Sequence, residues 1–218
     1  MSFGAKTVNA ATISGEPRIE AVVWDIGRVL VQWDFPRIWR HAIPDDAARA
    51  RFCTDVVSEA WHSRHDAGAA MDVLVAERKA RFPEHADLID LYRTHWLDAV
   101  PGPIAGTHEL VRELAERGVP QFSITNFGAE TWAMFRPTFP VLDHMGDIVV
   151  SGVEKLIKPG AEIFNLAARR FGKAPSNMLF IDDNADNIAA ARRLGWVVHH
   201  FAQGADALRA DLEARGLL

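Results

Sequence analysis

The hydrophobic pattern opens with a short apolar run that predicts a buried β-strand. Residues 21–24 read Ala-Val-Val-Trp, and Asp25, Ile26 and Gly27 follow them. A short, β-branched run that ends in polar residues and glycine is typical of a strand that leaves its sheet through a loop. We therefore expect residues 21–24 to be the first strand, with Asp25 at its carboxyl end.

The next stretch has a different character and predicts a group of helices. From about Pro36 to Trp96 the apolar residues recur at helical spacing among many Ala, Arg and Glu residues, and no run predicts a strand. The sequence Pro101-Gly102-Pro103 then breaks the chain. We expect a helical domain over residues 35–100, inserted after the first strand.

After this break, one pattern repeats three times: a helix that ends in basic residues and glycine, then an apolar strand that ends in polar residues. Such alternation predicts a parallel sheet with helices on both faces, which is an α/β, Rossmann-like core made of residues 19–34 and 101–218. The predicted helices are 108–117, 162–171 and 185–194, the glycines are Gly118, Gly172 and Gly195, and the strands are 121–126, 178–183 and 196–200.

Polar residues at the strand ends mark the expected site. In an open parallel sheet, the carboxyl ends of the strands lie at one edge, where ligands bind. Asp25, Thr125, Asp182 and Asp183 all stand at such ends. We expect them to meet in one crevice, with the helical insert above it as a lid.

Composition narrows the class of partner. The chain has 218 residues, of which 49% are hydrophobic and 24% charged, and its net charge is -5 without a Lys/Arg block. Concentrated positive charge is what nucleic-acid binding requires, so a nucleic-acid partner is not expected. Residues 1–18 contain no apolar signal core and no run reaches membrane-spanning length, which predicts a cytoplasmic protein with a mobile N-terminal arm at 1–18 and no membrane partner. The sequence does not predict the oligomeric state.

Asp25 is the candidate nucleophile, because a carboxylate is already ionised at neutral pH. Its attack on a phosphate dianion is opposed by Coulomb repulsion and needs a hard cation held by oxygen ligands. Asp182 and Asp183 offer such oxygens, although they would also suit the cap of the helix at 185–194. A helix cap needs only one such residue. Two adjacent buried carboxylates repel each other unless a cation lies between them, so the pair favours a metal site over a helix cap.

Three further residues are ambiguous when each is taken alone. Lys158 precedes Pro159, just before a positive helix end where a cation would neutralise a phosphoryl oxygen, yet a lysine is more often a solvated surface group. Asn187 lies four residues after Asp183 on the same helix face and would orient it, bind a phosphate or complete the cap. Thr125 is also an ordinary residue for a strand end.

Taken together, these motifs resemble the four ordered motifs of the haloacid dehalogenase (HAD) superfamily, and the resemblance covers nearly the whole chain. The segment between the first two motifs resembles the helical cap of that superfamily. The motifs are Asp25-Ile26-Gly27-Arg28-Val29-Leu30, Thr125-Asn126, Lys158-Pro159 and Phe180-Ile181-Asp182-Asp183-Asn184-Ala185-Asp186-Asn187.

The resemblance implies a role for each residue. Asp25 would be the nucleophile, Thr125 would hydrogen-bond the transferring group, and Lys158 would steady it. Mg²⁺ would be the cofactor, held by Asp182 and Asp183 with the Asp25 carboxylate and the Gly27 backbone carbonyl. Asn126, beside Thr125, is a further candidate contact. Arg28, His65 and Asn187 are candidate substrate contacts on the basis of their own chemistry and position, and Arg28 stands where small or amide residues are common in the family.

One position departs from the family pattern. Phosphatases of the superfamily usually carry a second Asp two positions after the nucleophile, where it protonates the leaving alcohol and then activates water, and this chain has Gly27 there. General acid–base help is worth about 10²–10⁴-fold. His62 and His65, which titrate near neutrality, are candidate replacements.

This departure leaves three functions open. The first is a phosphatase acting on a small phosphorylated metabolite, since the pattern resembles bacterial sugar-phosphate phosphatases of the glucose 1-phosphate type, whose leaving group needs less acid. The second is a 2-haloacid dehalogenase in which Asp25 attacks carbon, although that chemistry needs no metal and the Asp182-Asp183 pair counts against it. The third is a non-catalytic binding or regulatory protein, which the retained motif residues disfavour.

Overall fold

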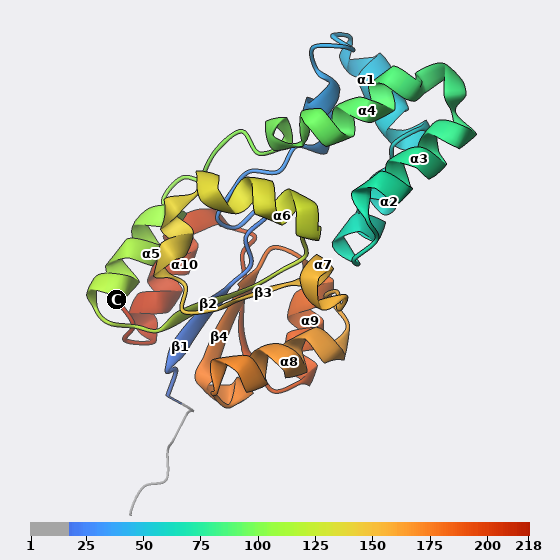
Figure 1. The fold of residues 1–218 in the computed structure, drawn as a ribbon. Coiled ribbons are helices and arrows are strands. Elements are labelled where there is room, and N and C mark those ends of the chain that lie inside the picture. Colours follow the sequence, from blue (N-terminus) through green and yellow to red (C-terminus); the bar gives the residue numbers. More distant parts are fainter. Residues whose placement is uncertain (1–17) are drawn as a thin grey trace, which may run out of the picture.

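Five parallel strands form one sheet in the order β3-β2-β1-β4-β5 (Figure 1). In this computed structural model, which describes residues 18–218, the strands are β1 (Ala21–Trp24), β2 (Gln121–Thr125), β3 (Ile148–Val150), β4 (Met178–Asp182) and β5 (Val197–His200). The predicted parallel sheet is confirmed, and so are the four predicted strands. The edge strand β3 adds three residues that the sequence analysis did not assign. The predicted arm at 1–18 lies, apart from Arg18, outside the described residues.

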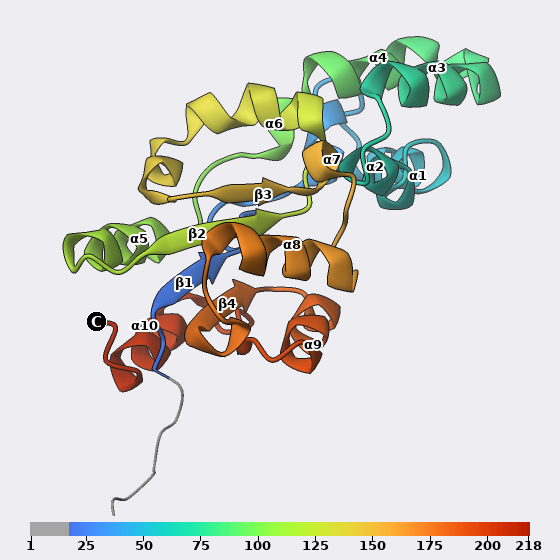
Figure 2. The same ribbon diagram turned by 60° about the horizontal axis from the view of Figure 1, so that its bottom comes forward.

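Helices cover both faces of the sheet (Figure 2). Alternate residues of β1 point to opposite faces: Val22 and Trp24 join one apolar cluster, Ala21 and Val23 the other. The first cluster includes α5 (Thr107–Glu116), α6 (Ala129–Phe135) and α10 (Gly204–Ala214), and the second includes α8 (Ala161–Phe171) and α9 (Ala185–Arg193). The central strand is therefore buried on both sides, as a parallel sheet requires.

The helix ends follow the predicted pattern. The glycines after α5, α8 and α9 have φ of 71°, 64° and 83°, the left-handed conformation that ends a helix at little cost to glycine. Two arginines stand in the last turn of α8 and two in that of α9, where they complement the negative helix end. Among residues 18–218, no helix has the length and apolar character needed to cross a membrane.

Between β1 and α5, residues 35–99 (here called the inserted segment) form helices joined by turns and contain no strand. The inserted segment contains the 3₁₀ helices η1 (Phe35–Trp39) and η3 (Trp96–Ala99), and α1 (Asp46–Asp55), α2 (Glu59–Asp66), α3 (Met71–Arg81) and α4 (Ala86–Thr94). Buried aromatic rings hold it together: Phe35 and Trp39 meet edge to face at 5.1 Å, and Trp61 and Tyr92 do so at 4.7 Å. Its apolar residues belong to the same cluster as one face of the sheet. Figure 1 shows the inserted segment as a lobe beside the carboxyl ends of the strands.

Candidate active site

Three carboxylates meet where β1 and β4 end. Asp25 follows β1, Asp182 is the last residue of β4, and Asp183 comes next. The two strands are neighbours, with Trp24 opposite Ile181, and the Asp25 N–H donates to the Ile181 carbonyl at 2.8 Å. One oxygen of each carboxylate lies within 4.8 Å of the others. The expected convergence of these strand ends is therefore present.

Lys158 stands between two of these carboxylates. Its Nζ lies 2.8 Å from Asp25 Oδ1 and 2.7 Å from Asp182 Oδ2, and it donates to the Ile124 carbonyl at 2.9 Å. Burial lowers the pKa of Lys158, but the two carboxylates outweigh it and the pKa is raised overall. The lysine is thus a fixed, buried positive charge beside the candidate nucleophile.

Asn126 fixes the backbone of Lys158. Its Oδ1 accepts from the Lys158 N–H at 2.9 Å, and its Nδ2 donates to the Lys158 carbonyl at 3.0 Å. Asn126 follows β2, so this pair of bonds ties the loop before α8 to the end of a central strand. The side chain of Asn126 also faces the cavity described below.

Asn187 and the helix α9 hold Asp182. Asn187 Nδ2 donates to both oxygens of Asp182, at 3.1 and 3.0 Å, and the Asn184 N–H donates to Oδ1 at 2.8 Å. Asn184, and neither aspartate, provides the side-chain cap of α9, through the N–H groups of Asp186 and Asn187. The alternative in which Asp182 or Asp183 caps this helix is therefore wrong. Asn187 orients Asp182, whereas one of the roles considered for it from the sequence was to orient Asp183.

The charges of the carboxylates are not balanced by the protein alone. Burial raises the pKa of Asp25 to about 7, against the opposing effect of Lys158, and the charges of Asp182 and Asp183 raise it further. Burial and Asp182 also raise the pKa of Asp183. Clustered carboxylates whose ionised forms are disfavoured suit a hard divalent cation with oxygen ligands. The donor set therefore fits Mg²⁺.

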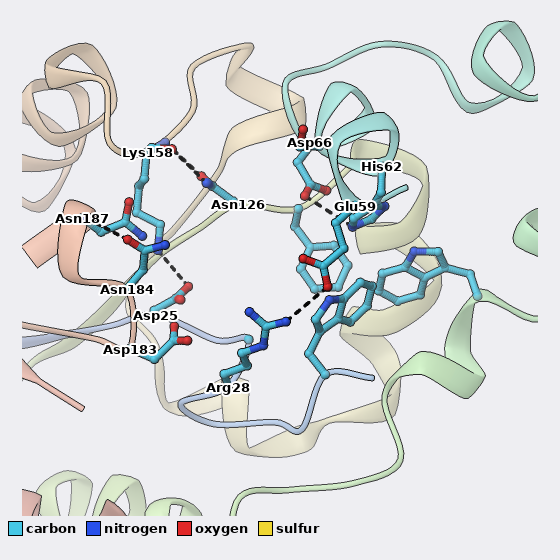
Figure 3. A pocket seen from close by; sticks show the side chains of 15 residues that line it. Asp25, Arg28, Glu59, His62, Asp66, Asn126, Lys158, Asp183, Asn184 and Asn187 are labelled. Atoms are coloured by element: carbon cyan, nitrogen blue, oxygen red, sulfur yellow. Dashed lines mark hydrogen bonds and ion pairs between the residues drawn. The ribbon is translucent and has the colours of Figure 1, made fainter. Parts of the chain in front are cut away.

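The carboxylates open into a cavity of about 300 Å³ between the sheet edge and the inserted segment (Figure 3). Asp25 and Asp183 face it, whereas Asp182 is fully buried behind them. The lining residues are Asp25, Gly27, Arg28, Asn126, Phe127, Lys158, Asp183, Asn184 and Asn187 from the core, Trp33 from the connection after β1, and Glu59, His62, Ser63, Asp66 and Trp96 from the inserted segment.

Arg28 connects the two sides of this cavity. It has φ of 58°, in the left-handed region that only a few per cent of non-glycine residues adopt. Its Nη2 lies 3.4 Å from Glu59 Oε1 on α2, and both side chains are more than half exposed. Gly27, beside it, lines the cavity as well, and a Cβ built at this position meets no heavy atom within 4 Å. Lack of space is therefore not the reason for glycine at this position.

Two predicted site residues lie away from the cavity. Thr125 is buried at the end of β2, where Asn126 and Phe127 form the wall. His65 is fully buried against Gly128: a Cβ on that glycine would lie 1.9 Å from His65 Cδ2. Its Nδ1 is 2.9 Å from the Ala69 carbonyl, so the ring serves the packing of α2 on the core.

The side of the cavity that α2 forms was not predicted from the sequence. Glu59, His62, Ser63 and Asp66 follow one another at spacings of three, one and three residues, which places them on one helical face. The sequence marked residues 61–68 as rich in groups that could contact a sugar or donate a proton, but only His62 and His65 were named as replacements for the missing acid, and His65 lies on the neighbouring face. The periodicity was readable, but which face meets the cavity depends on how the inserted segment packs on the core.

Comparison with known proteins identifies relatives along most of the chain. The sequence profile of haloacid dehalogenase-like hydrolases matches residues 19–195. A sesquiterpene phosphatase of Aspergillus oryzae is 23% identical over 210 residues, which cover 91% of this chain and 96% of that protein.

Solved structures share the fold at lower identity. A HAD-like family hydrolase of Porphyromonas gingivalis superposes with a TM-score of 0.70 at 18% identity, over 91% of this chain and 98% of that one. A HAD family enzyme of Bacteroides thetaiotaomicron, in complex with magnesium and inorganic phosphate, gives 0.63 at 20% identity, over 84% and 93%. An L-2-haloacid dehalogenase of Xanthobacter autotrophicus with chloropropionic acid covalently bound gives 0.60 at 16% identity, over 92% and 84%.

Proposed function

We propose that this chain, which belongs to the haloacid dehalogenase-like hydrolase family, is a Mg²⁺-dependent phosphomonoester hydrolase with Asp25 as its covalent nucleophile. The observation that carries the proposal is the contact of Lys158 Nζ with Asp25 at 2.8 Å, within a cluster of three carboxylates. A nucleophilic carboxylate, a fixed cation and oxygen ligands for a metal are the groups that phosphoryl transfer to an aspartate requires.

Asp25, Asp182, Asp183 and the Gly27 carbonyl are the ligands that would hold Mg²⁺. When bound, the ion neutralises charge on the transferring phosphoryl group and so permits an anion to attack it. Lys158 adds a second positive charge at a fixed position. Asn187 keeps Asp182 oriented through its two hydrogen bonds.

The chemistry proceeds in two displacements. An oxygen of Asp25 attacks phosphorus, the bond to the ester oxygen breaks, and an aspartyl-phosphate forms while the ester oxygen takes up a proton and leaves as the alcohol. Water then attacks the same phosphorus, the bond to Asp25 breaks, and inorganic phosphate leaves. Asn126 and Arg28, which face the cavity, are proposed to bind phosphoryl oxygens, and Thr125 to support the strand end from which Asn126 projects.

The substrate is proposed to be a small phosphorylated metabolite, with sugar phosphates as the first candidates. A cavity of about 300 Å³ suits a ligand of this size, and Glu59, Ser63 and His62 offer polar contacts to hydroxyl groups. Trp33, Trp96 and Phe127 provide an aromatic wall that also accepts an apolar alcohol. The sesquiterpene phosphatase relative supports including prenyl phosphates among the candidates.

The inserted segment is proposed to act as the cap of this site. It contributes a third of the lining residues and meets the core through exposed side chains such as the Arg28–Glu59 pair. A cap in this position excludes bulk water and selects the leaving group, as lids commonly do.

The test is a metal-dependent screen of phosphorylated metabolites with 2-chloropropionate alongside. We expect phosphate release that requires Mg²⁺, stops in chelator and is lost at least a thousandfold in Asp25→Asn, because the nucleophile is gone. Asp206→Asn, an exposed aspartate on α10, is the matched control and keeps full activity. Chloride release that survives chelator would support a dehalogenase instead, and turnover by Asp25→Asn would refute covalent catalysis.

A further inference from the structure

A further, largely buried carboxyl group faces the cavity from the inserted segment. Asp66 is the last residue of α2, and its side chain is only 14% exposed. Figure 3 shows it on the wall opposite Asp25 and Asp183, with the open cavity between them. Within residues 18–218, the His62 ring at 3.4 Å is the one ion-pair contact of this carboxyl group.

The position of Asp66 is fixed by contacts with the core. Ser151 Oγ donates to its backbone carbonyl at 2.5 Å, which ties the end of α2 to the residue after β3. Ser151 Oγ also accepts from the Phe127 N–H at 2.9 Å, so the same hydroxyl joins the end of α2 to a cavity-lining loop. The carboxyl group thus has a defined place at the cavity although it belongs to the inserted segment.

The surroundings of Asp66 allow it to carry a proton near neutrality. Burial raises the pKa of Asp66 to about 7, although the nearby His65 and the Gly128 N–H favour the ionised form. The His62 ring, 3.4 Å away, is not a compensating cation, because burial lowers the pKa of His62 to about 3. Tyr92 on α4 also lies near Asp66 and supplies no positive charge.

His62 is oriented as a neutral ring. Its Nδ1 lies 2.7 Å from the Tyr92 hydroxyl, and its Nε2 faces Asp66 Oδ2. A Tyr92 hydroxyl that donates to Nδ1 leaves the ring proton on Nε2, directed at the carboxyl group. The histidine would therefore support the carboxylate after it loses its proton, and would not itself be the acid.

We propose, on the basis of the function proposed above, that Asp66 is the general acid and base of this enzyme, in place of the carboxylate missing at Gly27. In the first displacement, Asp66 gives its proton to the ester oxygen as the bond to phosphorus breaks, which yields the neutral alcohol and the Asp66 carboxylate. In the second, the carboxylate takes a proton from the attacking water, and Asp66 returns to its protonated form. The protons balance over one turnover.

The test compares two substrates of similar size that differ in their need for an acid. The 4-nitrophenolate released from 4-nitrophenyl phosphate is stable without a proton, whereas the alkoxide released from benzyl phosphate is not. We expect Asp66→Asn to lower kcat/KM for benzyl phosphate about 10²–10⁴-fold, which is the usual size of general acid catalysis. For 4-nitrophenyl phosphate we expect a loss of less than about tenfold, since kcat/KM reports the first displacement.

Glu59→Gln is the matched control, because Glu59 is an acid on the same face of α2 and lines the same cavity. It should change both substrates by the same factor. A second measurement needs no variant: in the unaltered protein, the ratio of kcat/KM for benzyl over 4-nitrophenyl phosphate should fall above about pH 7. Titrations that affect both substrates equally cancel in this ratio.

Equal losses on the two substrates, or a ratio that does not change with pH, would overturn the role of Asp66 while leaving the phosphatase intact. The phosphatase itself fails if the unaltered protein hydrolyses neither ester and no member of the metabolite panel, and the role of Asp66 then falls with it. Activity that remains in Asp25→Asn would refute covalent catalysis by Asp25. Thermal unfolding of Asp66→Asn shows whether a lost activity is a lost fold.

Discussion

At the scale of single residues, Asp66 makes a clear contribution to pH-dependent stability. The pKa of Asp66 is raised from 3.8 to about 7 in the folded chain. Above pH 7 both folded and unfolded chains are ionised, and the folded chain bears the full cost of a buried charge. Below about pH 4 both are protonated and the cost disappears. The carboxyl group therefore destabilises the fold increasingly as pH rises from about 4 to 7.

We expect Asp66→Asn to raise the free energy of unfolding by about 1–3 kcal/mol at pH 8, because the amide fills the same space without a charge to bury. The gain should shrink steadily toward pH 4. Denaturant unfolding at pH 4.5, 6 and 8 measures it, with Asp206→Asn as the exposed control. A gain that is constant with pH would mean that the Asp66 carboxyl is not destabilised by burial.

At the scale of elements, the packing of α2 on the core depends on close approach to Gly128, just before α6. A Cβ there would lie 1.9 Å from His65 Cδ2 and 2.0 Å from Nε2, far inside van der Waals contact. The ring has no room to retreat, because it is fully buried and its Nδ1 is held by the Ala69 carbonyl. Nearby, the Met71 N–H donates to Glu130 Oε1 at 3.0 Å, so a shift of α2 away from Gly128 would also disturb this contact.

We expect Gly128→Ala to lower the free energy of unfolding by about 1–3 kcal/mol, the usual cost of overpacking. In a chain of this length that corresponds to roughly 2–4 °C in Tm per kcal/mol. Gly102→Ala is the control, because a Cβ at Gly102 meets nothing within 4 Å and should change Tm by no more than about 2 °C. Equal Tm values for the two variants would show that α2 can move away from Gly128 without loss of stability.

Several elements of the core are determined by local sequence pattern alone. The helices near 162–171 and 185–194 were predictable because their period, terminal arginines and following glycine agree, and the strand at 21–24 because its short β-branched run ends in polar residues and glycine. The edge strand β3, three residues long, carries too little pattern to stand out from a loop. Asp25, Lys158 and Asp183 were predictable as one site because parallel strand ends must share an edge.

The other half of the cavity could not be predicted in the same way. Which face of α2 meets the cavity follows from how His65 packs on Gly128 and how Ser151 binds the Asp66 carbonyl. These contacts join residues between 63 and 85 positions apart, and no periodicity encodes them. The prediction from sequence therefore selected His65, which packs against Gly128, as a candidate acid and did not single out Asp66, which lines the cavity.

At the scale of the whole molecule, the carboxylate cluster should couple metal binding to stability. Asp25, Asp182 and Asp183 come from the ends of two central strands, so a cation between them would link elements that unfold together. Only the folded chain brings these oxygens within 4.8 Å of one another. A ligand that binds the folded chain alone stabilises it by about 2.7 kcal/mol at a hundredfold excess over Kd.

We therefore expect saturating Mg²⁺ to raise Tm by roughly 5–10 °C, while KCl at the same ionic strength does not. The shift should be lost in Asp183→Asn, which removes a cavity-facing ligand, and kept in Asp206→Asn. This measurement does not depend on knowing the substrate, so it separates the metal site from the reaction. A Mg²⁺ shift that persists in Asp183→Asn would place the ion elsewhere, and the absence of any shift would favour the metal-independent dehalogenase, because that chemistry leaves the carboxylate cluster without a cation to hold.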